Sequence, residues 1–480
     1  MKHNPIMTLM LMMWMPLAVF SQTDWEKMTA DDHETSLPMV NLTVDTTLLC
    51  KENYNLGHIT IRDWQQRTEG KETVSYDCKM RYRGATSLRY DKKSFAIKLI
   101  DDSGEDLDAD IFGIREENDW ILDAMATDRI RMRNRVLFDI WNEMDKTPYS
   151  TDFANRNGTK GQYVELFINE QYHGLYCMTD KIDRKLLNLK KAKVASDQSV
   201  TVRGLLYKGD SWTDATLLTG YNDSTPMDSD VWEGWELQYP DDYPSDNTWV
   251  PLTQLIDFCI SDGDNLNAHA EDFFYMDNVV NYCILLVAHN IIDNSFKNTF
   301  LSTPNIENGH RYLFTPWDLD CSLGNLYDGT HNDVYTDMDA FFKWGFFHNL
   351  WKHDVAHFNS LLLQRWNELA ATILSADSLN RRLDRYAALF EESGAWQREK
   401  AKWNNNPVPL NLQEELQYVK DWYAENLSAL HHAINQLTGI SSPQAEEKEP
   451  ALYLLNGQRT DHTWGRQLLI GKNRKTILRP

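Results

Sequence analysis

From about residue 36 to 100 the chain alternates between apolar stretches and polar turns in the way that short β-strands do. The clearest example is the segment 92–99, KKSFAIKL. Successive side chains of a strand point to opposite faces, so Phe95, Ile97 and Leu99 share one face and Lys98 lies on the other. This pattern predicts a strand with one apolar face and one polar face.

The apolar spacing changes to that of a helix over residues 128–144. Strand-like alternation resumes over residues 161–168 and, after a turn predicted at Asn169-Glu170, returns through residues 172–176. These segments predict a helix followed by a β-hairpin.

Beyond about residue 245 the apolar spacing is mainly helical. Helices are predicted over residues 252–260, 273–292, 358–374 and 412–437. A short strand pair, 299–301 and 312–315, interrupts them, and residues 451–478 predict a small β-rich appendage after the polar linker 441–449.

The order of these elements predicts an α+β protein with a β-rich N-terminal half and a mainly helical C-terminal half. We place the boundaries at residues 22–215 for the β-rich region, 216–440 for the helical region and 441–480 for the linker and appendage.

The first residues predict export from the cytoplasm. Lys2 and His3 precede the apolar run 7–20, MTLMLMMWMPLAVF, and small residues follow near Ser21. A positive start, a brief apolar core and small residues at the end are typical of a secretory signal peptide. The run is too short for a stable transmembrane helix, and no later stretch predicts one. We expect residues 1–21 to be a signal peptide and the protein to lie in the periplasm, at the cell surface or outside the cell.

The net charge argues against nucleic-acid binding, and the cysteine spacing argues against a structural metal site. The net charge of −23 argues against nucleic acid as a partner, because phosphate neutralisation needs a basic surface. The six cysteines show no CxxC pair and no zinc-type spacing. Cys50 and Cys78 are the pair that could form a disulfide in an oxidising compartment.

Candidate chemistry begins at the end of the predicted helix 273–292. Asp293 follows its apolar last turns, and Asn298 comes five residues later, just before a predicted strand. An Asp and an Asn at this separation are the base and a metal ligand of the catalytic loop in protein kinases. Alone, the spacing occurs by chance in many chains.

A second acidic segment, TPWDLDCSLG, follows the strand 312–315. In an extended segment Asp318 and Asp320 project to the same side, where two carboxylates repel unless a cation or proton compensates them. Such oxygen ligands suit Mg²⁺, which proteins usually hold with one or two carboxylates and substrate phosphate oxygens. The alternative is that both acids cap surface turns.

A phosphate site of this kind also needs a positive group. Lys98 lies on the polar face of its strand, as the lysine of the kinase V-A-I-K strand does, and Lys93 is the rival candidate. Just upstream, RYRGATS offers the Arg83 guanidinium, backbone amides and the Ser87 hydroxyl, which suit a phosphate cradle or a simple turn.

Six segments together resemble the spore coat protein CotH kinase-like family over roughly residues 36 to 330. They are RYRGATS, KKSFAIKL, VELFINEQYHGLYCMTDKIDR, LLYKGD, IIDNSFKNTF and TPWDLDCSLG, in the order of the family. The resemblance implies an atypical kinase with a divergent two-lobed protein-kinase-like fold that transfers phosphate from ATP to Ser or Thr of a protein, with Mg or Mn.

The resemblance also implies roles for individual residues. Asp293 would be the catalytic Asp, Asn298, Asp318 and Asp320 would be metal ligands, and Lys98 or Lys93 would contact the nucleotide phosphates. The chain departs from the family where Asp180 stands in place of Glu before Lys181 and where RGATS replaces RGNSS.

Two other functions stay open at this point. ATP is scarce outside the cytoplasm, which favours a non-catalytic surface or adhesion protein that reuses the fold. A carbohydrate-active protein would use Asp318 and Asp320 as paired acids, although adjacent acids on one strand leave little room for a sugar ring.

Overall fold

The structure, a computed structural model, describes residues 36–437 apart from residues 153, 198 and 344, together with four short strands between residues 452 and 477. The chain forms two compact units, one up to Leu430 and one from His431 to Pro480. The expected signal peptide, residues 1–21, lies outside the described residues.

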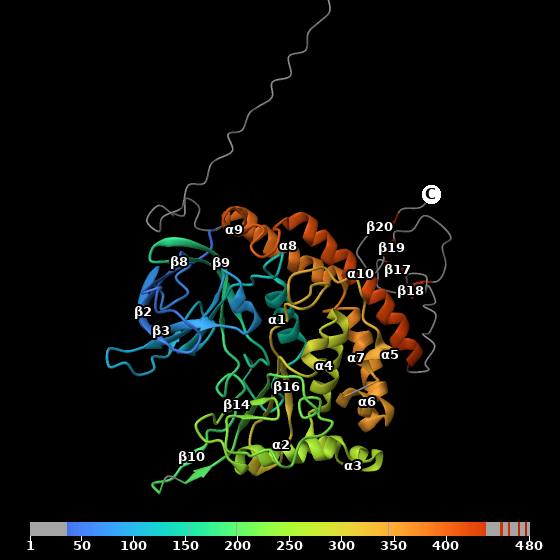
Figure 1. Ribbon diagram of the computed structural model, residues 1–480. Helices are drawn as coiled ribbons and strands as arrows, with labels where there is room; N and C mark the ends of the chain where they lie inside the picture. Colours follow the sequence, from blue (N-terminus) through green and yellow to red (C-terminus); the bar gives the residue numbers. More distant parts are fainter. Residues whose placement is uncertain are drawn as a thin grey trace, which may run out of the picture. The chain divides into compact units, whose positions relative to one another are not determined.

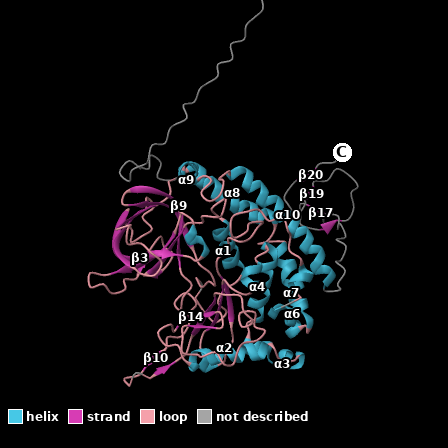
Figure 2. Ribbon diagram, viewed as in Figure 1, coloured by secondary structure: helices cyan, strands magenta, loops and turns pink. Residues whose placement is uncertain are grey.

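Seven strands of the first unit close into a barrel, which Figure 2 shows as the curved magenta strands around β3 and β9. In barrel order they are β1 (Met39–Val44), β2 (Asn55–Arg62), β3 (Thr73–Arg83), β4 (Ser94–Ile100), β7 (Asp119–Asp123), β9 (Gln171–Asp180) and β8 (Gly161–Ile168). All neighbours are antiparallel except β1 and β8, which run parallel and close the barrel.

The barrel interior is a packed core. Val40, Ile59, Ile97, Leu122 and Val164 point into it and none of them is exposed. A small barrel filled with side chains leaves no room inside for a ligand, so functional groups must lie on its outer face or at its rim.

Strand β4 confirms the predicted alternation. Phe95, Ile97 and Leu99 are buried in the barrel, and Lys98 lies half-buried on the outer face. The two-lobed kinase layout is not evident in the sheets, because the β-rich half is a closed barrel. The coarser expectation, a β-rich N-terminal half and a helical C-terminal half, is confirmed.

The β8–β9 hairpin also has its predicted turn. Asn169 and Glu170 both have positive φ, 49° and 67°, as a two-residue turn between right-twisted strands requires. Further along β9, Gly174 has a φ of 134°, and a Cβ there would lie 2.7 Å from Glu399 Oε2 and Trp403 Nε1. Only glycine lets the barrel approach that part of the chain so closely.

A second sheet of five strands carries the candidate site. Its order is β13 (Val231–Trp232), β14 (Trp235–Tyr239), β12 (Leu205–Gly209), β15 (Thr299–Thr303) and β16 (Leu313–Pro316), all antiparallel. The sequence predicted only the β15–β16 pair. Two further ribbons pair β5 (Ala109–Asp110) with β6 (Glu116–Glu117) and β10 (Lys193–Val194) with β11 (Val200–Thr201).

Helices make up most of the C-terminal half of the first unit (Figure 1). In that half the helices are α2 (Asp246–Cys259), α3 (Gly263–Phe273), α4 (Met276–His289), α5 (Met338–Phe341), α6 (Gly345–Lys352), α7 (Phe358–Ala370), α8 (Ala376–Glu392), α9 (Ala395–Trp403) and α10 (Leu412–Leu437). Helix α1 (Arg133–Met144) lies in the N-terminal half, between β7 and β8. Short 3₁₀ turns are η2 (Thr86–Arg89), η3 (Ile292–Ser295), η4 (Ile306–Asn308) and η5 (Val355–His357).

The predicted helix 412–437 is confirmed as α10, whereas the helix expected over 273–292 is shorter. It begins at Met276 and ends at His289, because Asn290 adopts a left-handed conformation that terminates the helix. None of the helices in the described part of the chain is long and apolar enough to cross a lipid bilayer.

In the second unit four strands form one sheet in the order β18 (Arg459–Thr460), β17 (Leu452–Leu454), β19 (Leu469–Ile470) and β20 (Thr476–Ile477). The linker expected over residues 441–449 lies outside the described residues, and the bounds of the appendage stay a prediction.

Candidate functional site

Asp293 lies in the 3₁₀ turn η3 that follows α4, and three donors hold its carboxylate. Asn298 Nδ2 donates to Oδ2 at 3.0 Å, and the Lys297 ammonium lies 3.3 Å from the same oxygen. On the other side Trp212 Nε1 donates to Oδ1 at 2.9 Å, while its indole stacks on Phe296 with ring centroids 4.1 Å apart. The predicted pair Asp293 and Asn298 is therefore in direct contact.

The β15–β16 hairpin brings the second acidic segment to the same place. Thr299 pairs with Pro316, so the residues just outside the two strands face each other, and Trp317 N donates to Asn298 O at 2.9 Å. Asn294 Nδ2 fastens the two segments by donating to the carbonyls of Asn298 and Trp317, both at 2.7 Å.

Asp318 and Asp320 are neighbours for a different reason than the sequence suggested. The strand ends at Pro316, Asp318 has a φ of 56°, and a turn begins at Leu319. The expectation of an extended segment is wrong, because the left-handed residue bends the chain. The fully buried Leu319 anchors this bend, and the two carboxyls still lie close enough to influence each other's ionisation.

The structure adds a third carboxylate that the sequence analysis missed, Asp123 at the end of β7. Asn134 Nδ2 of α1 donates to Asp123 Oδ2 at 3.0 Å, and Asn134 Oδ1 accepts from Leu319 N at 3.1 Å. Asn134 thus links the barrel strand to the Asp318 turn. The available signal was the acid at the end of an alternating strand, DWILD, on the same face as Ile121.

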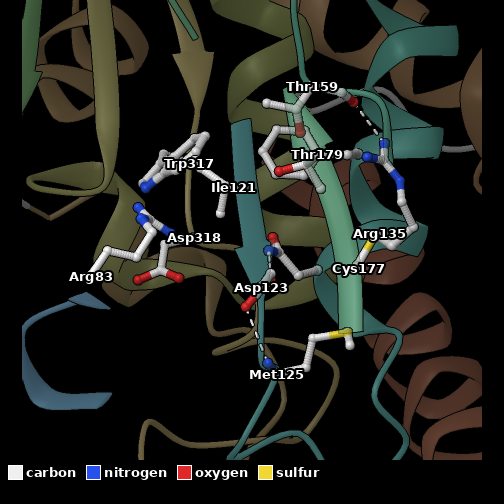
Figure 3. Close-up of a pocket in the computed structure, with 12 residues that line it drawn as sticks. Arg83, Ile121, Asp123, Met125, Arg135, Thr159, Cys177, Thr179, Trp317 and Asp318 are labelled. Atoms are coloured by element: carbon white, nitrogen blue, oxygen red, sulfur yellow. Dashed lines mark hydrogen bonds between the residues drawn. The ribbon is translucent and has the colours of Figure 1, made fainter. Parts of the chain in front are cut away.

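A small cavity separates these elements (Figure 3). Its volume is about 30 Å³, roughly the share of one water molecule in the liquid. Asp123 and Ile121 line it from the barrel, and Asp318 and Trp317 from the turn. The Arg83 guanidinium closes one side, 5.4 Å above the Trp317 ring and beside Asp318 in Figure 3.

The acids perturb one another strongly. Burial among protein atoms raises the pKa of Asp318, the Asp123 carboxylate raises it further, and the Arg83 and Lys208 cations oppose both effects. The Asp318 side chain nevertheless reaches solvent, so it lies at the mouth of a concave site. The pKa of Asp320 is raised well above its usual range by burial first and then by Asp318, Asp123 and Asp128.

Carboxylates with raised pKa values favour a compensating cation. Two of them with phosphate oxygens form the usual set for Mg²⁺, and the Asn298 side-chain oxygen is a further hard ligand. The donor chemistry therefore fits a metal that is shared with a phosphate. Among the described residues no three His, Cys, Asp or Glu side chains are placed to enclose a metal ion by themselves.

The predicted lysines have other partners. Lys93 Nζ donates to the carbonyls of Leu88 and Tyr90 at 2.9 and 2.6 Å and so fixes the loop after β3. Lys98 Nζ lies 3.7 Å from Asp119 Oδ2. The cations that act on Asp318 are Arg83, which was predicted, and Lys208 of β12, which was missed.

Ser87 lies in η2, in the loop that joins β3 to β4. Gly84 at the start of this loop has a φ of 114°, and a Cβ there would lie 2.1 Å from Ser87 Oγ. The turn that the sequence RGATS predicts is therefore formed, with the Ser87 hydroxyl folded back over Gly84.

Two other expectations are resolved by the structure. All six cysteines are free thiols, so the disulfide considered for Cys50 and Cys78 is not formed. Asp180 pairs with arginines rather than with a lysine: Arg156 Nη2 donates to it at 2.5 Å and Arg115 Nε lies at 3.0 Å.

Comparison with known protein families identifies the family of this chain. No curated protein sequence matches the chain. The family model described as CotH kinase protein matches residues 80–430, which is most of the chain and includes every residue of the site from Arg83 to Asp320. This chain belongs to the CotH kinase protein family.

Proposed function

We propose that this protein is an exported kinase that transfers the γ-phosphoryl group of ATP to a Ser or Thr hydroxyl of a protein, with Mg²⁺ or Mn²⁺. The observation that carries the proposal is the meeting of Asp123, Asp318 and Asp320, from a barrel strand and a distant turn, beside Arg83 and the Asp293–Asn298 pair. In this proposal the barrel serves as one lobe of a divergent kinase and the helical region as the other.

Each residue has a distinct task. Arg83 and Lys208 bind phosphate oxygens and offset their charge, and the solvent-exposed Asp318 lets phosphates approach from outside the small cavity. The metal, held by Asp318, Asp320 and Asn298, would neutralise charge on the phosphates when bound. Asp123 would support it from the barrel.

Asp293 acts on the acceptor. Its carboxylate orients the incoming hydroxyl and takes the hydroxyl proton while the new O–P bond forms and the bond to ADP breaks. The Trp212 and Asn298 donors fix the direction of this carboxylate.

The test is incubation of the purified protein with labelled ATP, Mg²⁺ or Mn²⁺, and protein acceptors. We expect Asp293→Asn to lower transfer about a thousandfold, since removal of a general base costs about 10²- to 10⁴-fold. Asp264→Asn, at an exposed position in α3, is the matched control and should transfer normally. Equal labelling of the wild type and Asp293→Asn would contradict the assignment.

The second candidate is a non-catalytic surface protein that retains the fold. The cavity volume of about 30 Å³ favours it, because that space is far too small for a nucleotide unless the barrel and the Asp318 turn separate. A metal-dependent rise in melting temperature with an ATP analogue, lost in Asp318→Asn, would support the kinase. Absence of any such rise would support the surface protein.

A further inference from the structure

A second, larger cavity lies at the far end of the β15–β16 hairpin from Asn298. Its volume is about 560 Å³, which is within the range of sites for small molecules. Tyr149, Lys190 and Tyr275 line part of it, and the hairpin turn lines one side through Pro304, Asn305, Asn308, Gly309 and Arg311. The five residues of β15 lie between Asn298 and Pro304, which places these two about 20 Å apart along the extended chain, so this cavity is separate from the acidic site.

The cavity is basic in an acidic protein. The chain has 71 acidic and 48 basic residues, yet none of the described residues that line this cavity is Asp or Glu. Lys190 and Arg311 are exposed at its rim, and neither forms an ion pair within the described part of the chain. Two cations without a carboxylate partner at a cavity attract an anionic group.

Both cationic residues line the cavity, and each has a contact with a neighbouring lining residue. Lys190 N donates to Pro304 O at 2.9 Å, which ties the segment after β9 to the hairpin turn. The Arg311 guanidinium carbon lies 5.7 Å from the centroid of the Tyr275 ring. Lys190 is therefore anchored beside the hairpin turn through its main chain, and Arg311 through its side chain.

Aromatic rings and amides complete the lining. The rings of Tyr149 and Tyr275 lie 5.7 Å apart at 45°, and the Tyr149 hydroxyl donates to Leu187 O at 2.8 Å, which fixes that ring. Asn188 and Asn305 add side-chain amides. Ring faces suit the C–H faces of a sugar, and amides suit its hydroxyl groups.

We propose that this cavity binds an anionic saccharide, a sugar ring that carries a carboxylate, sulfate or phosphate group. Arg311 and Lys190 bind the anionic group, Tyr275 packs against the ring, and Asn188 and Asn305 bind hydroxyls. Sugar binding at this site does not depend on phosphoryl transfer. An acidic peptide is the competing class of ligand, and the experiment below distinguishes it from a charged sugar.

The experiment is calorimetric titration of the full-length protein in the presence of EDTA. The probes are glucuronate, galacturonate and glucose 6-phosphate, with glucose, inorganic phosphate and a Glu-rich peptide as comparisons. We expect at least one charged sugar to bind at least tenfold more tightly than glucose, phosphate and the peptide. Absence of binding by all three charged sugars, or equal or tighter binding of phosphate or the peptide, would overturn the proposal.

Variants locate the site. Arg311→Gln and Lys190→Gln should each raise the Kd of the charged sugar about tenfold or more, since a hydrogen bond to a charged group is lost. Tyr275→Leu should weaken charged and neutral sugars alike. Lys352→Gln, an exposed lysine at the end of α6, is the matched control. Unchanged binding in Arg311→Gln, with unchanged thermal unfolding, would also overturn the proposal, whereas Asp318→Asn should bind the sugar normally.

Discussion

Two groups of charged side chains lie close to the barrel, and they are built in opposite ways. In one, the Glu399 carboxylate of α9 accepts from Lys92 Nζ at 2.7 Å and from Arg131 Nε at 2.8 Å, and none of the three side chains is exposed. In the other, the charges of Asp123, Asp318 and Asp320 repel one another, and Arg83 and Lys208 oppose the effect at Asp318.

The difference is the one expected between a structural group of charges and the cation-binding group that we propose. A buried carboxylate whose oxygens all have donors is stabilised as an anion, and the two cations lower the pKa of Glu399 despite its burial. Within this triad of Glu399, Lys92 and Arg131, burial lowers the pKa of Lys92 to about 7, with Arg131 adding to the fall and Glu399 opposing it. In the acidic group the negative charges are not matched in this way by positive ones, which is the arrangement expected of a site that binds a cation.

The largest loss of stability should follow removal of the negative charge from the triad of Glu399, Lys92 and Arg131. Glu399→Gln leaves Lys92 and Arg131 buried without their anion, and removal of one partner of a buried pair costs about 3–5 kcal/mol. Urea unfolding should show this loss as a lower midpoint with an unchanged slope.

The matched control for that change is Lys92→Met. Glu399 then keeps Arg131 on Oε1 and Leu175 N, at 2.8 Å, on Oε2. We expect a loss at least twofold smaller than in Glu399→Gln. Equal losses of unfolding free energy would contradict this expectation, because the fold would then depend on Lys92 as much as on Glu399.

Asp145 is an intermediate case and gives the next largest effect. Asn157, Asn278 and Asn281 donate to its buried carboxylate at 2.7–3.0 Å, but neutral amides do not replace a cation. Burial raises the pKa of Asp145 to about 6, with Arg365 and the amides opposing. The unfolded group titrates near 3.8, so the folded state binds the extra proton between the two values.

A folded pKa above the unfolded one gives stability that is present at low pH and lost as pH rises. The Asp145 contribution should therefore decline between about pH 4 and pH 6, by on the order of 3 kcal/mol. The measurement is the unfolding free energy of the wild type minus that of Asp145→Asn across this range. A difference that does not change with pH would show that Asp145 keeps an ordinary pKa.

These cases show how far the sequence could predict the molecule. The alternation in β4 and the turn at Asn169 depend on neighbouring residues, so both were predicted. Asp123 was missed because it lies 170 positions before Asp293 and joins the site only when the barrel packs against the helical region. Strands β12–β14 were missed because they are short pieces between polar loops.

The acidic group itself shows the same limit. The spacing of the acids after β16 predicted that the side chains of Asp318 and Asp320 lie together, and they do lie close enough for Asp318 to raise the pKa of Asp320. Their arrangement could not be predicted, since the left-handed Asp318 is held by contacts such as that of Leu319 N with Asn134 of α1.

Removal of one charge from the acidic group should raise the stability of the protein, by less than the losses predicted above. Asp320→Asn removes a carboxylate that Asp318 and Asp123 repel, so it should stabilise the protein by about 1 kcal/mol, in the range of other substitutions that trade function for stability. Thermal unfolding without metal measures this gain, and the rise in melting temperature with Mn²⁺ and an ATP analogue should disappear. If Asp320→Asn is instead less stable than the wild type, the Asp320 carboxylate stabilises the fold, as the Glu399 carboxylate does.

Substitution of Trp212 should give the smallest change in stability. It tests whether Asp293 is a structural carboxylate like Glu399 or belongs with the acidic group. Asp293 has three donors, as a structural carboxylate does, but its side chain is 25% exposed and its partner indole is 55% exposed. Trp212→Phe keeps the stacking on Phe296 and removes only the N–H donor, so we expect a stability change below about 0.5 kcal/mol, as for surface positions. Transfer from ATP should fall a few-fold through kcat, because the carboxylate is less well oriented while nucleotide contacts stay intact. If unfolding shows a loss of 2 kcal/mol or more instead, the Asp293 donors serve the fold, and Asp293 belongs with Glu399 rather than with the acidic group.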